Sequence, residues 1–104
     1  MQIFLYKNNI QVGECELELK THIISKLKIY EDFRCKGFCS ELIKKVIKIA
    51  KEKKFKNLIL YVKSWNTSAI KCYKKNNFKT IKILYKKKDN SIGGYKMELK
   101  IEKK

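Results

Sequence analysis

A single glycine stands just before the longest helical pattern of the sequence, in the stretch Arg34-Cys35-Lys36-Gly37-Phe38-Cys39-Ser40. Where a strand leads into a helix, the first backbone N–H groups of the helix have no internal partner, and the helix dipole favours an anion. Gly37 would let the backbone approach that anion closely. The stretch therefore predicts a phosphate-binding turn, although a lone glycine before a helix is also the pattern of an ordinary turn.

The helix that follows the glycine is the strongest periodic pattern in the chain. Apolar residues recur at helical spacing from Leu42 to Ala50, whereas the charged residues between them face the other way. Residues 58–62 then form a continuous apolar run, which is typical of a strand covered on both faces. A strand, a helix and a second strand in this order indicate a crossover unit.

The segment before the glycine predicts an antiparallel meander. Three apolar or alternating runs are separated by short polar stretches, and these runs cover residues 3–7, 10–19 and 22–30. Asn8-Asn9 provides the first turn. Gly13 interrupts the alternation of the second run and is expected to mark a bulge.

The segment after the crossover unit predicts a shorter helix and two last strands. Asn66 or Thr67 can cap this helix, which is expected to run through Lys75. Two strands follow, at residues 78–85 and 95–101, with a polar turn between them at 86–94. The order β-β-β-α-β-α-β-β describes one α/β (α+β) domain over residues 1–104, with a mixed, mostly antiparallel central sheet and two helices.

A second group of residues with useful chemistry lies on the predicted short helix. Asn66, Ala69 and Tyr73 are three and four residues apart in turn, so they lie close to one helix face. An amide side chain can donate to and accept from an amide-rich ligand, and a phenol can give a proton to a leaving thiolate. A helix cap and a core aromatic are the alternative interpretation of the same residues.

Taken together, the two segments resemble the GNAT superfamily of N-acetyltransferases. The family's first signature is Arg or Gln, two residues, Gly, one residue, then Gly or Ala, and the residues here are Arg34, Gly37 and Cys39. Its later motif is Asn, two residues, Ala, three residues and Tyr, with Gly-Phe four residues after the Tyr. The similar residues in this chain are Asn66, Ala69, Tyr73 and Asn77-Phe78. The resemblance extends from about Ile3 to Ile101. Cys39 and Asn77 stand where the family has a smaller residue, and both are compatible with cofactor binding.

The resemblance implies a cofactor, acetyl-CoA, and a role for each matching residue. The strand before the turn would diverge from its neighbour and bind the pantetheine arm through the backbone of Leu27, Lys28 and Ile29. The pyrophosphate would be held at the turn, by Arg34, Cys35, Lys36, Gly37, Phe38, Cys39 and Ser40. Asn66, with Ala69 in the same cofactor-binding set, would contact the arm, and the Tyr73 hydroxyl would protonate the departing sulfur. The acceptor amine would attack the thioester directly, without a covalent acyl-enzyme.

The general base is less well defined by the sequence. An amine must be neutral to attack, so a carboxylate within reach would help. Family members that acetylate protein N-termini often carry a Glu where this chain has Tyr61. Glu16, in the middle of three alternating carboxylates, is the catalytic candidate here, although such a pattern is also typical of a solvated strand face, and His22 could serve instead.

The acceptor side is shorter than in most family members. These usually begin with a strand and one or two helices before the equivalent of Ile3, and the helices commonly shape the acceptor pocket. The resemblance therefore implies an acceptor site that is open, or that a second subunit completes. The protein is expected to be a monomer or a homodimer.

Charge and composition argue against a nucleic-acid partner. The formal charge of +16 would suit phosphate binding, but Arg34 is the one arginine among 26 basic residues, and the lysines are spread along the chain. Readers of nucleic acid depend on arginine for bidentate contacts. A solvated basic surface is therefore favoured over a nucleic-acid patch.

Cysteine spacing and hydropathy argue against a metal site and a membrane location. The four cysteines have no Cys-x-x-Cys spacing and one histidine to join them, so no bound metal is expected. No apolar run approaches the roughly 20 residues that span a bilayer, and the N-terminus lacks the pattern of a signal peptide. The thiols are expected to be reduced and the chain to be cytoplasmic.

The sequence as a whole thus predicts an acetyl-CoA-dependent N-acetyltransferase that acts on a primary amine of a small molecule or a protein. The alternative is a basic nucleic-acid-binding or interaction module that uses the same scaffold without catalysis. A third possibility is a protein that binds the cofactor but does not turn it over, because its acceptor half is incomplete.

Overall fold

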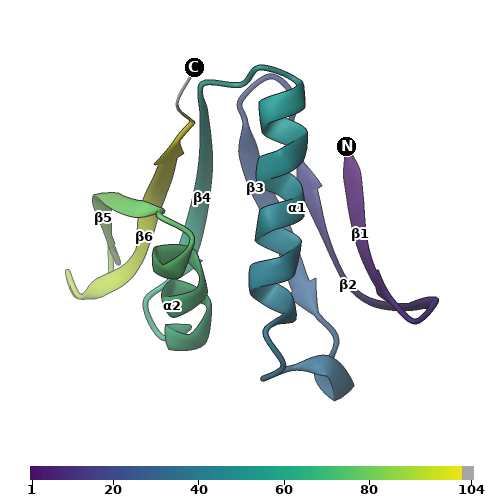
Figure 1. The fold of residues 1–104 in the computed structure, drawn as a ribbon. Helices are drawn as coiled ribbons and strands as arrows, with labels where there is room; N and C mark the ends of the chain where they lie inside the picture. Colours follow the sequence, from purple (N-terminus) through teal and green to yellow (C-terminus); the bar gives the residue numbers. More distant parts are fainter. Residues whose placement is uncertain (102–104) are drawn as a thin grey trace.

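The secondary-structure elements follow the predicted order. The computed structural model describes residues 1–101, and its elements are β1 (Gln2–Lys7), β2 (Ile10–Leu17), β3 (Ile23–Ile29), a 3₁₀ turn (Glu31–Phe33), α1 (Phe38–Glu52), β4 (Asn57–Lys63), α2 (Thr67–Lys75), β5 (Lys79–Tyr85) and β6 (Ile92–Lys100). The predicted α/β class, a mixed sheet with two helices, is confirmed (Figure 1).

All six strands belong to one sheet in the order β1-β2-β3-β4-β6-β5. Only β3 and β4 pair in parallel; the other neighbours are antiparallel. The parallel pair lies on either side of α1 along the chain, as the predicted crossover unit requires.

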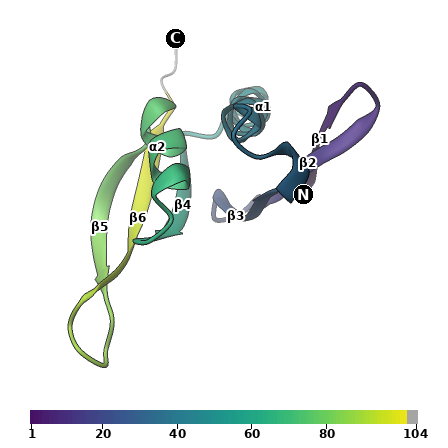
Figure 2. The same ribbon diagram turned by 90° about the horizontal axis from the view of Figure 1, so that it is seen from below.

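The parallel pair separates soon after it begins. The two strands are paired only at Ile23 with Ile59 and at Ile24 with Leu60, whereas β4 and β6 pair over seven residues. Figure 2 shows the result, since β4, β5 and β6 stand apart from β1, β2 and β3, with α1 above the junction. The second half of β3 is therefore left with one edge that β4 does not use.

The core lies between the sheet and the two helices. One face of α1 is fully buried, through Leu42, Ile43, Val46 and Ala50, as the helical spacing predicts. The run 58–60 of β4 is also buried, together with Val62. Each fully buried aliphatic side chain of this kind contributes about 1.5–3 kcal/mol, so the position of α1 against the sheet is well fixed. Within residues 1–101, neither helix has the length and apolar character that crossing a bilayer requires.

Close approach of a neighbouring strand explains two of the four glycines, Gly13 and Gly94. The polar turn predicted at 86–94 is too long, because β6 already begins at Ile92. A Cβ on Gly94 would lie 2.6 Å from the Val62 carbonyl oxygen, so this glycine allows β4 to approach β6. Gly93 has a milder constraint, with a side-chain carbon of Lys86 at 3.1 Å.

The bulge expected at Gly13 is confirmed and has a further role. The register of β1 and β2 shifts where Leu5 faces Gly13. A Cβ at Gly13 would lie 2.6 Å from the terminal carbon of Ile29 and 2.8 Å from the Lys28 carbonyl oxygen. The glycine therefore lets the end of β3 lie tightly against β2, and this end of β3 leads into the turn before α1.

Candidate functional site

The turn before α1 presents backbone N–H groups to the outside. Gly37 is the N-cap residue and has a left-handed backbone with φ of 79°, and Cys35 is also left-handed, at φ of 62°. Among residues 1–101 no side chain caps the helix, and its first backbone hydrogen bond runs from the Glu41 N–H to the Gly37 carbonyl at 3.2 Å. The N–H groups of Phe38, Cys39 and Ser40 therefore have no acceptor within the helix. Unpaired N–H groups at the start of a helix can bind an anion.

Space is open in front of Gly37. A Cβ placed on this residue would meet nothing within 4 Å, so backbone conformation, not crowding, is what requires glycine here. Arg34 and Lys36 are exposed on the same turn and add positive charge. The Arg34 side chain is tied to the preceding strand, because its Nε donates to the Ile29 carbonyl at 3.0 Å.

The predicted pantetheine-binding residues lie on the free edge of β3. Lys28 and Ile29 pair with Glu14 and Gly13 of β2 on one side, while β4 has already diverged on the other. The strand divergence expected at Leu27, Lys28 and Ile29 is thus present. A free strand edge offers backbone donors and acceptors to an extended, amide-containing ligand.

Asn66 caps α2, as one interpretation of the sequence predicted. Its Oδ1 accepts hydrogen bonds from the Ala69 N–H at 3.3 Å and from the Ser68 hydroxyl at 3.5 Å. Within residues 1–101 the Asn66 amide nitrogen has no hydrogen-bond acceptor, so it stays able to donate to a ligand. Ala69 is half-buried against the core. The cap role therefore leaves room for the predicted cofactor contact.

Tyr73 has a buried ring and an accessible hydroxyl. The residue is 6% exposed, and its ring packs against Phe78 with centroids 6.1 Å apart. The hydroxyl forms no hydrogen bond within residues 1–101. Every buried side-chain oxygen of these residues has a hydrogen-bond partner, so the Tyr73 oxygen is not buried and reaches solvent. Burial raises the pKa of the Tyr73 phenol, and the nearby thiols of Cys39 and Cys72 raise it further. The group thus keeps its proton at neutral pH and can act as an acid.

The two predicted segments meet where α1 begins. The buried Asn76 side chain, at the end of α2, donates from its Nδ2 to the Ser40 hydroxyl at 3.0 Å and to the Cys72 carbonyl at 2.8 Å. Tyr73 follows Cys72 directly, so the turn and the phenol are held in one assembly. Sequence reasoning missed Asn76, although an Asn directly before the Asn77-Phe78 motif was a signal for a helix end.

Glu16 lies on the other face of the sheet. Its neighbours Cys15 and Leu17 are buried beneath α1, so alternation directs Glu16 away from both helices. It forms an ion pair with Lys26 at 3.4 Å. The adjacent carboxylate, Glu14, accepts a hydrogen bond from Tyr30 at 2.5 Å. The structure therefore does not bring Glu16 next to Tyr73, and its role as a base remains a prediction.

His22 lies at the far end of β3 from the turn. Its Nδ1 is 3.1 Å from the Asn57 Oδ1, and the Asn57 amide donates to Glu98 at 3.0 Å. Because the amide nitrogen faces Glu98, the Asn57 oxygen must accept, and the Nδ1 of His22 carries the proton. The imidazole also stacks on Phe55, with ring centroids 3.8 Å apart. These contacts give His22 a structural role where β3 and β4 begin.

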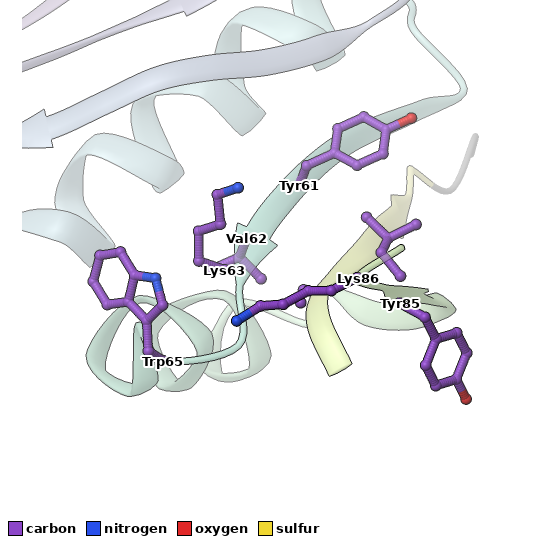
Figure 3. A pocket seen from close by; sticks show the side chains of 9 residues that line it. Tyr61, Val62, Lys63, Trp65, Tyr85 and Lys86 are labelled. Atoms are coloured by element: carbon purple, nitrogen blue, oxygen red, sulfur yellow. The ribbon is translucent and has the colours of Figure 1, made fainter. Parts of the chain in front are cut away.

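A cavity that sequence reasoning missed lies between the end of β4 and the β5–β6 hairpin (Figure 3). It has a volume of about 400 Å³ and is lined by Tyr61, Val62, Lys63, Trp65, Leu84, Tyr85, Lys86, Gly93 and Gly94. Figure 3 shows Trp65 beside α2 and Tyr85 on the other side of the cavity. Trp65 is 75% exposed and directly precedes Asn66. The cavity is thus aromatic and basic, and no carboxylate from the described part of the chain, residues 1–101, lines it.

Known structures share this fold over almost the whole chain. The ribosomal-protein-S18-alanine N-acetyltransferase from Escherichia coli superimposes with a TM-score of 0.84 at 18% identity, over 100% of this chain and 70% of that protein. An N-acetyltransferase from Staphylococcus aureus Mu50 gives 0.76 at 24% identity, over 95% and 66%. The yncA protein from Salmonella typhimurium, solved with its cofactor acetyl-CoA, gives 0.79 at 12% identity, over 99% and 65%. The chain thus spans about two thirds of the length of these proteins, and the identities support the fold alone.

The sequence itself carries the assignment to a family. It has no significant match among curated proteins. However, residues 4–78 match the model of the Acetyltransferase (GNAT) family, a region that includes the turn before α1, the diverging edge of β3 and the Asn66 to Phe78 motif. The match covers well over half of the 104 residues. The chain therefore belongs to the GNAT family of acetyltransferases.

Proposed function

We propose that this protein transfers an acetyl group from acetyl-CoA to a primary amine of a small molecule or a protein, in the cytoplasm and as a monomer or homodimer. One observation carries the proposal: the uncapped start of α1 and the free edge of β3 lie at the same end of the sheet, joined by the contact of Arg34 with Ile29. A ligand with a pyrophosphate at one end and an amide-rich arm at the other fits both features. Acetyl-CoA is such a ligand, and the yncA structure contains it.

The binding groups follow the length of the cofactor. Backbone N–H groups from Cys35 to Ser40 would hold the pyrophosphate, with Arg34 and Lys36 adding positive charge. The free edge of β3 at 27–29 would pair with the amides of the pantetheine arm. The unused Asn66 amide nitrogen would donate to the same arm. In this arrangement the thioester lies near Tyr73, which α2 carries two turns beyond Asn66.

The proposed chemistry is direct transfer. The amine nitrogen attacks the thioester carbonyl carbon, the carbon–sulfur bond breaks, and the CoA sulfur takes the proton of the Tyr73 hydroxyl. A positioned acid of this kind contributes about 10²–10⁴ in rate. Attack leaves a positive charge and an extra proton on the former amine nitrogen. A base must remove this proton to give the neutral amide, and Glu16 remains our candidate. Because Glu16 faces away from the helices, the proton would reach it through water.

The cavity in Figure 3 is our candidate for the acceptor site. It adjoins Asn66 through Trp65 and lies at the carboxyl end of β4, where β3 has diverged. The exposed Trp65 and Tyr85 rings offer stacking surface to the acceptor. Lys63 and Lys86 would lower the pKa of an amine bound between them, because like charges disfavour the protonated form. A larger fraction of the acceptor would then be neutral and able to attack.

Thermal unfolding in the presence of acetyl-CoA tests the cofactor site. A ligand at a hundredfold excess over its Kd stabilises the folded state by about 2.7 kcal/mol, which corresponds to roughly 10–20 °C in a domain of this size. The Lys36→Glu variant should lose most of this shift, because it places a carboxylate at the pyrophosphate turn. Lys48→Glu makes the same charge change on the exposed side of α1, about 15 Å from the start of the helix, and should keep the shift.

The same variants distinguish the rival function. Non-specific nucleic-acid binding depends on total charge, so both variants would weaken it alike, with a steep dependence on salt. The nucleic-acid-binding function would be favoured by two results together: acetyl-CoA does not raise the unfolding temperature, and both variants weaken a salt-dependent binding of DNA equally. A panel of amine acceptors, with release of free CoA thiol as the readout, then identifies the substrate.

A further inference from the structure

The cavity in Figure 3 lies where the β5–β6 hairpin is tied to the end of β4. The Ser64 N–H donates to the Gly93 carbonyl at 3.1 Å, and the Ser64 hydroxyl donates to the Ile92 carbonyl at 3.0 Å. Gly94 is buried and pairs with Lys63 across the two strands. The walls of the cavity are therefore joined by hydrogen bonds on both sides of the point where Trp65 begins the connection to α2.

Two lysines bring positive charge into this cavity. Lys63 comes from β4 and Lys86 from the hairpin, and both line the cavity. The Lys86 stem lies along Gly93, since a Cβ on that glycine would be 3.1 Å from the Lys86 Cγ, and Figure 3 shows the side chain extended toward the end of β4. Within residues 1–101 neither lysine forms an ion pair with a carboxylate. Both charges are therefore available to a ligand.

The charged groups around the cavity leave its positive character intact. Lys96 lies over the ring of Tyr61, a lining residue, with its Nζ 5.9 Å from the ring centroid. Asp89 is the one acidic residue between 86 and 91, and its carboxylate accepts hydrogen bonds from the N–H and the hydroxyl of Ser91. Glu98 is further along β6 and lines a different cavity. A ligand beside Tyr61 thus meets ammonium groups and not carboxylates.

This charge has a consequence for an amine acceptor. A free alkyl amine is mostly protonated at neutral pH, so Lys63 and Lys86 would repel it. An anionic group on the same molecule offsets the repulsion by pairing with the lysines. The cavity offers the amine no carboxylate that would hold it in the protonated form. The lysines can therefore attract such an acceptor and still favour its neutral, reactive amine.

The size of the cavity restricts the acceptor further. Its volume of about 400 Å³ is near the lower end of the roughly 300–1,000 Å³ that is typical of small-molecule sites. The exposed rings of Trp65 and Tyr85 lie on two sides of it and can cover the carbon skeleton of a ligand. A small molecule with few atoms between its amine and its anionic group fits these dimensions.

We infer that the acceptor is a small amine that carries a carboxylate or a phosphate a few bonds from its nitrogen, and that Lys63 and Lys86 hold this anionic group. The transfer itself is unchanged: the nitrogen bonds to the acetyl carbon, the carbon–sulfur bond breaks, the nitrogen loses one proton and the CoA sulfur gains one. The anionic group stays unreacted. Polyamines and the lysine side chains of basic proteins are poor acceptors for the same electrostatic reason. The inference rests on the proposed function, because it names the substrate class of the proposed acceptor site.

Three acceptors of nearly equal size test the inference. Glutamate, glutamine and glutamine amide differ by the successive replacement of a carboxylate by an amide, so negative charge is removed while the carbon skeleton is kept. Exposed ion pairs change an affinity by about twofold to fivefold each, so we expect kcat/KM to fall about threefold at each replacement and about tenfold over the series. Phosphoethanolamine, compared with ethanolamine, shows whether a phosphate is preferred to a carboxylate.

A charge reversal in the cavity should reverse the order of the acceptors. In Lys86→Glu we expect glutamine amide to react faster than glutamate. Lys79→Glu makes the same charge change at the other end of β5, outside the cavity lining, and should keep the original order. The inference is overturned if Lys86→Glu keeps the original order, or if the unmodified protein prefers glutamine amide. Transfer to acidic peptides but to no small amine also overturns it.

Binding without catalysis separates the inference from the proposed function. Trp65 is the one tryptophan of the chain, so its indole N–H gives a single NMR signal from the cavity. Glutarate, which has no amine to acetylate, should shift this signal saturably, whereas the diamine cadaverine should not. Lys86→Glu should raise the Kd for glutarate about tenfold. If no amine is acetylated, the proposed function is wrong, while a Trp65 signal that glutarate leaves unchanged overturns the inference.

Discussion

Replacing Tyr73 by Phe isolates the one atom to which we assign acid catalysis. The buried ring is retained, so its packing against Phe78 should persist. The hydroxyl has no hydrogen-bond partner within residues 1–101, so its removal leaves no buried group unpaired. We therefore expect the free energy of unfolding to change by less than about 0.5 kcal/mol.

The expected loss is in turnover. Without the phenol, the CoA sulfur would leave without a proton from the protein, and removing a positioned acid costs about 10²–10⁴ in rate, or roughly 3–5 kcal/mol in the barrier. We expect kcat to fall at least about a hundredfold, while the Kd for acetyl-CoA changes less than about twofold.

The assay follows free-thiol release at saturating acceptor, with urea unfolding and a cofactor titration on the same samples. Tyr6→Phe is the matched control, since Tyr6 is 53% exposed and alternates along β1 with the buried Leu5, so it faces away from α1 and should behave as the unmodified protein. A Tyr73→Phe variant that is folded, binds acetyl-CoA normally and turns over within about threefold of the unmodified rate would refute the assignment.

Three further predictions address the other parts of the site. Asn66→Asp keeps the acceptor that caps the Ala69 N–H but removes the amide donor, so we expect unchanged unfolding in urea and a weaker affinity for acetyl-CoA, whereas Asn66→Ala should also lose about 0.5–2 kcal/mol of stability. Trp65→Ala should raise the KM for the acceptor in steady-state assays with little effect on stability or on cofactor Kd, because the side chain is 75% exposed. Burial raises the pKa of the Cys15 thiol from 9.0 to about 12, so above pH 9 the unfolded chain loses a proton that the folded chain keeps. The contribution of this thiol to the free energy of unfolding should therefore be fully present below pH 9 and fall by up to about 1.4 kcal/mol per pH unit from pH 9 toward 12. Urea titrations should show a flatter slope over this pH range for Cys15→Ala.

The elements that depend on local periodicity could be predicted from the sequence. Leu42 to Ala50 repeat at helical spacing because one face of α1 is buried. The apolar run 58–62 predicts the central strand β4 correctly, but β4 is not covered on both faces throughout, because Tyr61 is 50% exposed. The sequence places Gly93 and Gly94 in the predicted turn 86–94, whereas both lie in β6. A glycine that permits a turn and one that permits close approach of a second strand leave the same mark in a sequence, and only the Val62 carbonyl beside Gly94 separates them.

The assembly of the site was less accessible to sequence reasoning. The divergence of β3 from β4 was expected from the family resemblance, since no propensity in Leu27 to Ile29 encodes it. The bridge from Asn76 to Ser40 joins residues more than 30 positions apart, so it arises only when α1 and α2 pack together. The cavity beside Trp65 likewise combines β4 with a hairpin that follows it about 20 residues later.

Assignment of backbone amide signals by NMR, followed by titration with coenzyme A, tests the central claim most directly. We predict that the largest shifts fall on the N–H groups of residues 35–40, with a second set at 27–29. The amides around His22 and Asn57, at the opposite end of β3 and β4, should stay unchanged. Shifts that are absent at 35–40, or that spread evenly over the lysine-rich surface, would contradict the account.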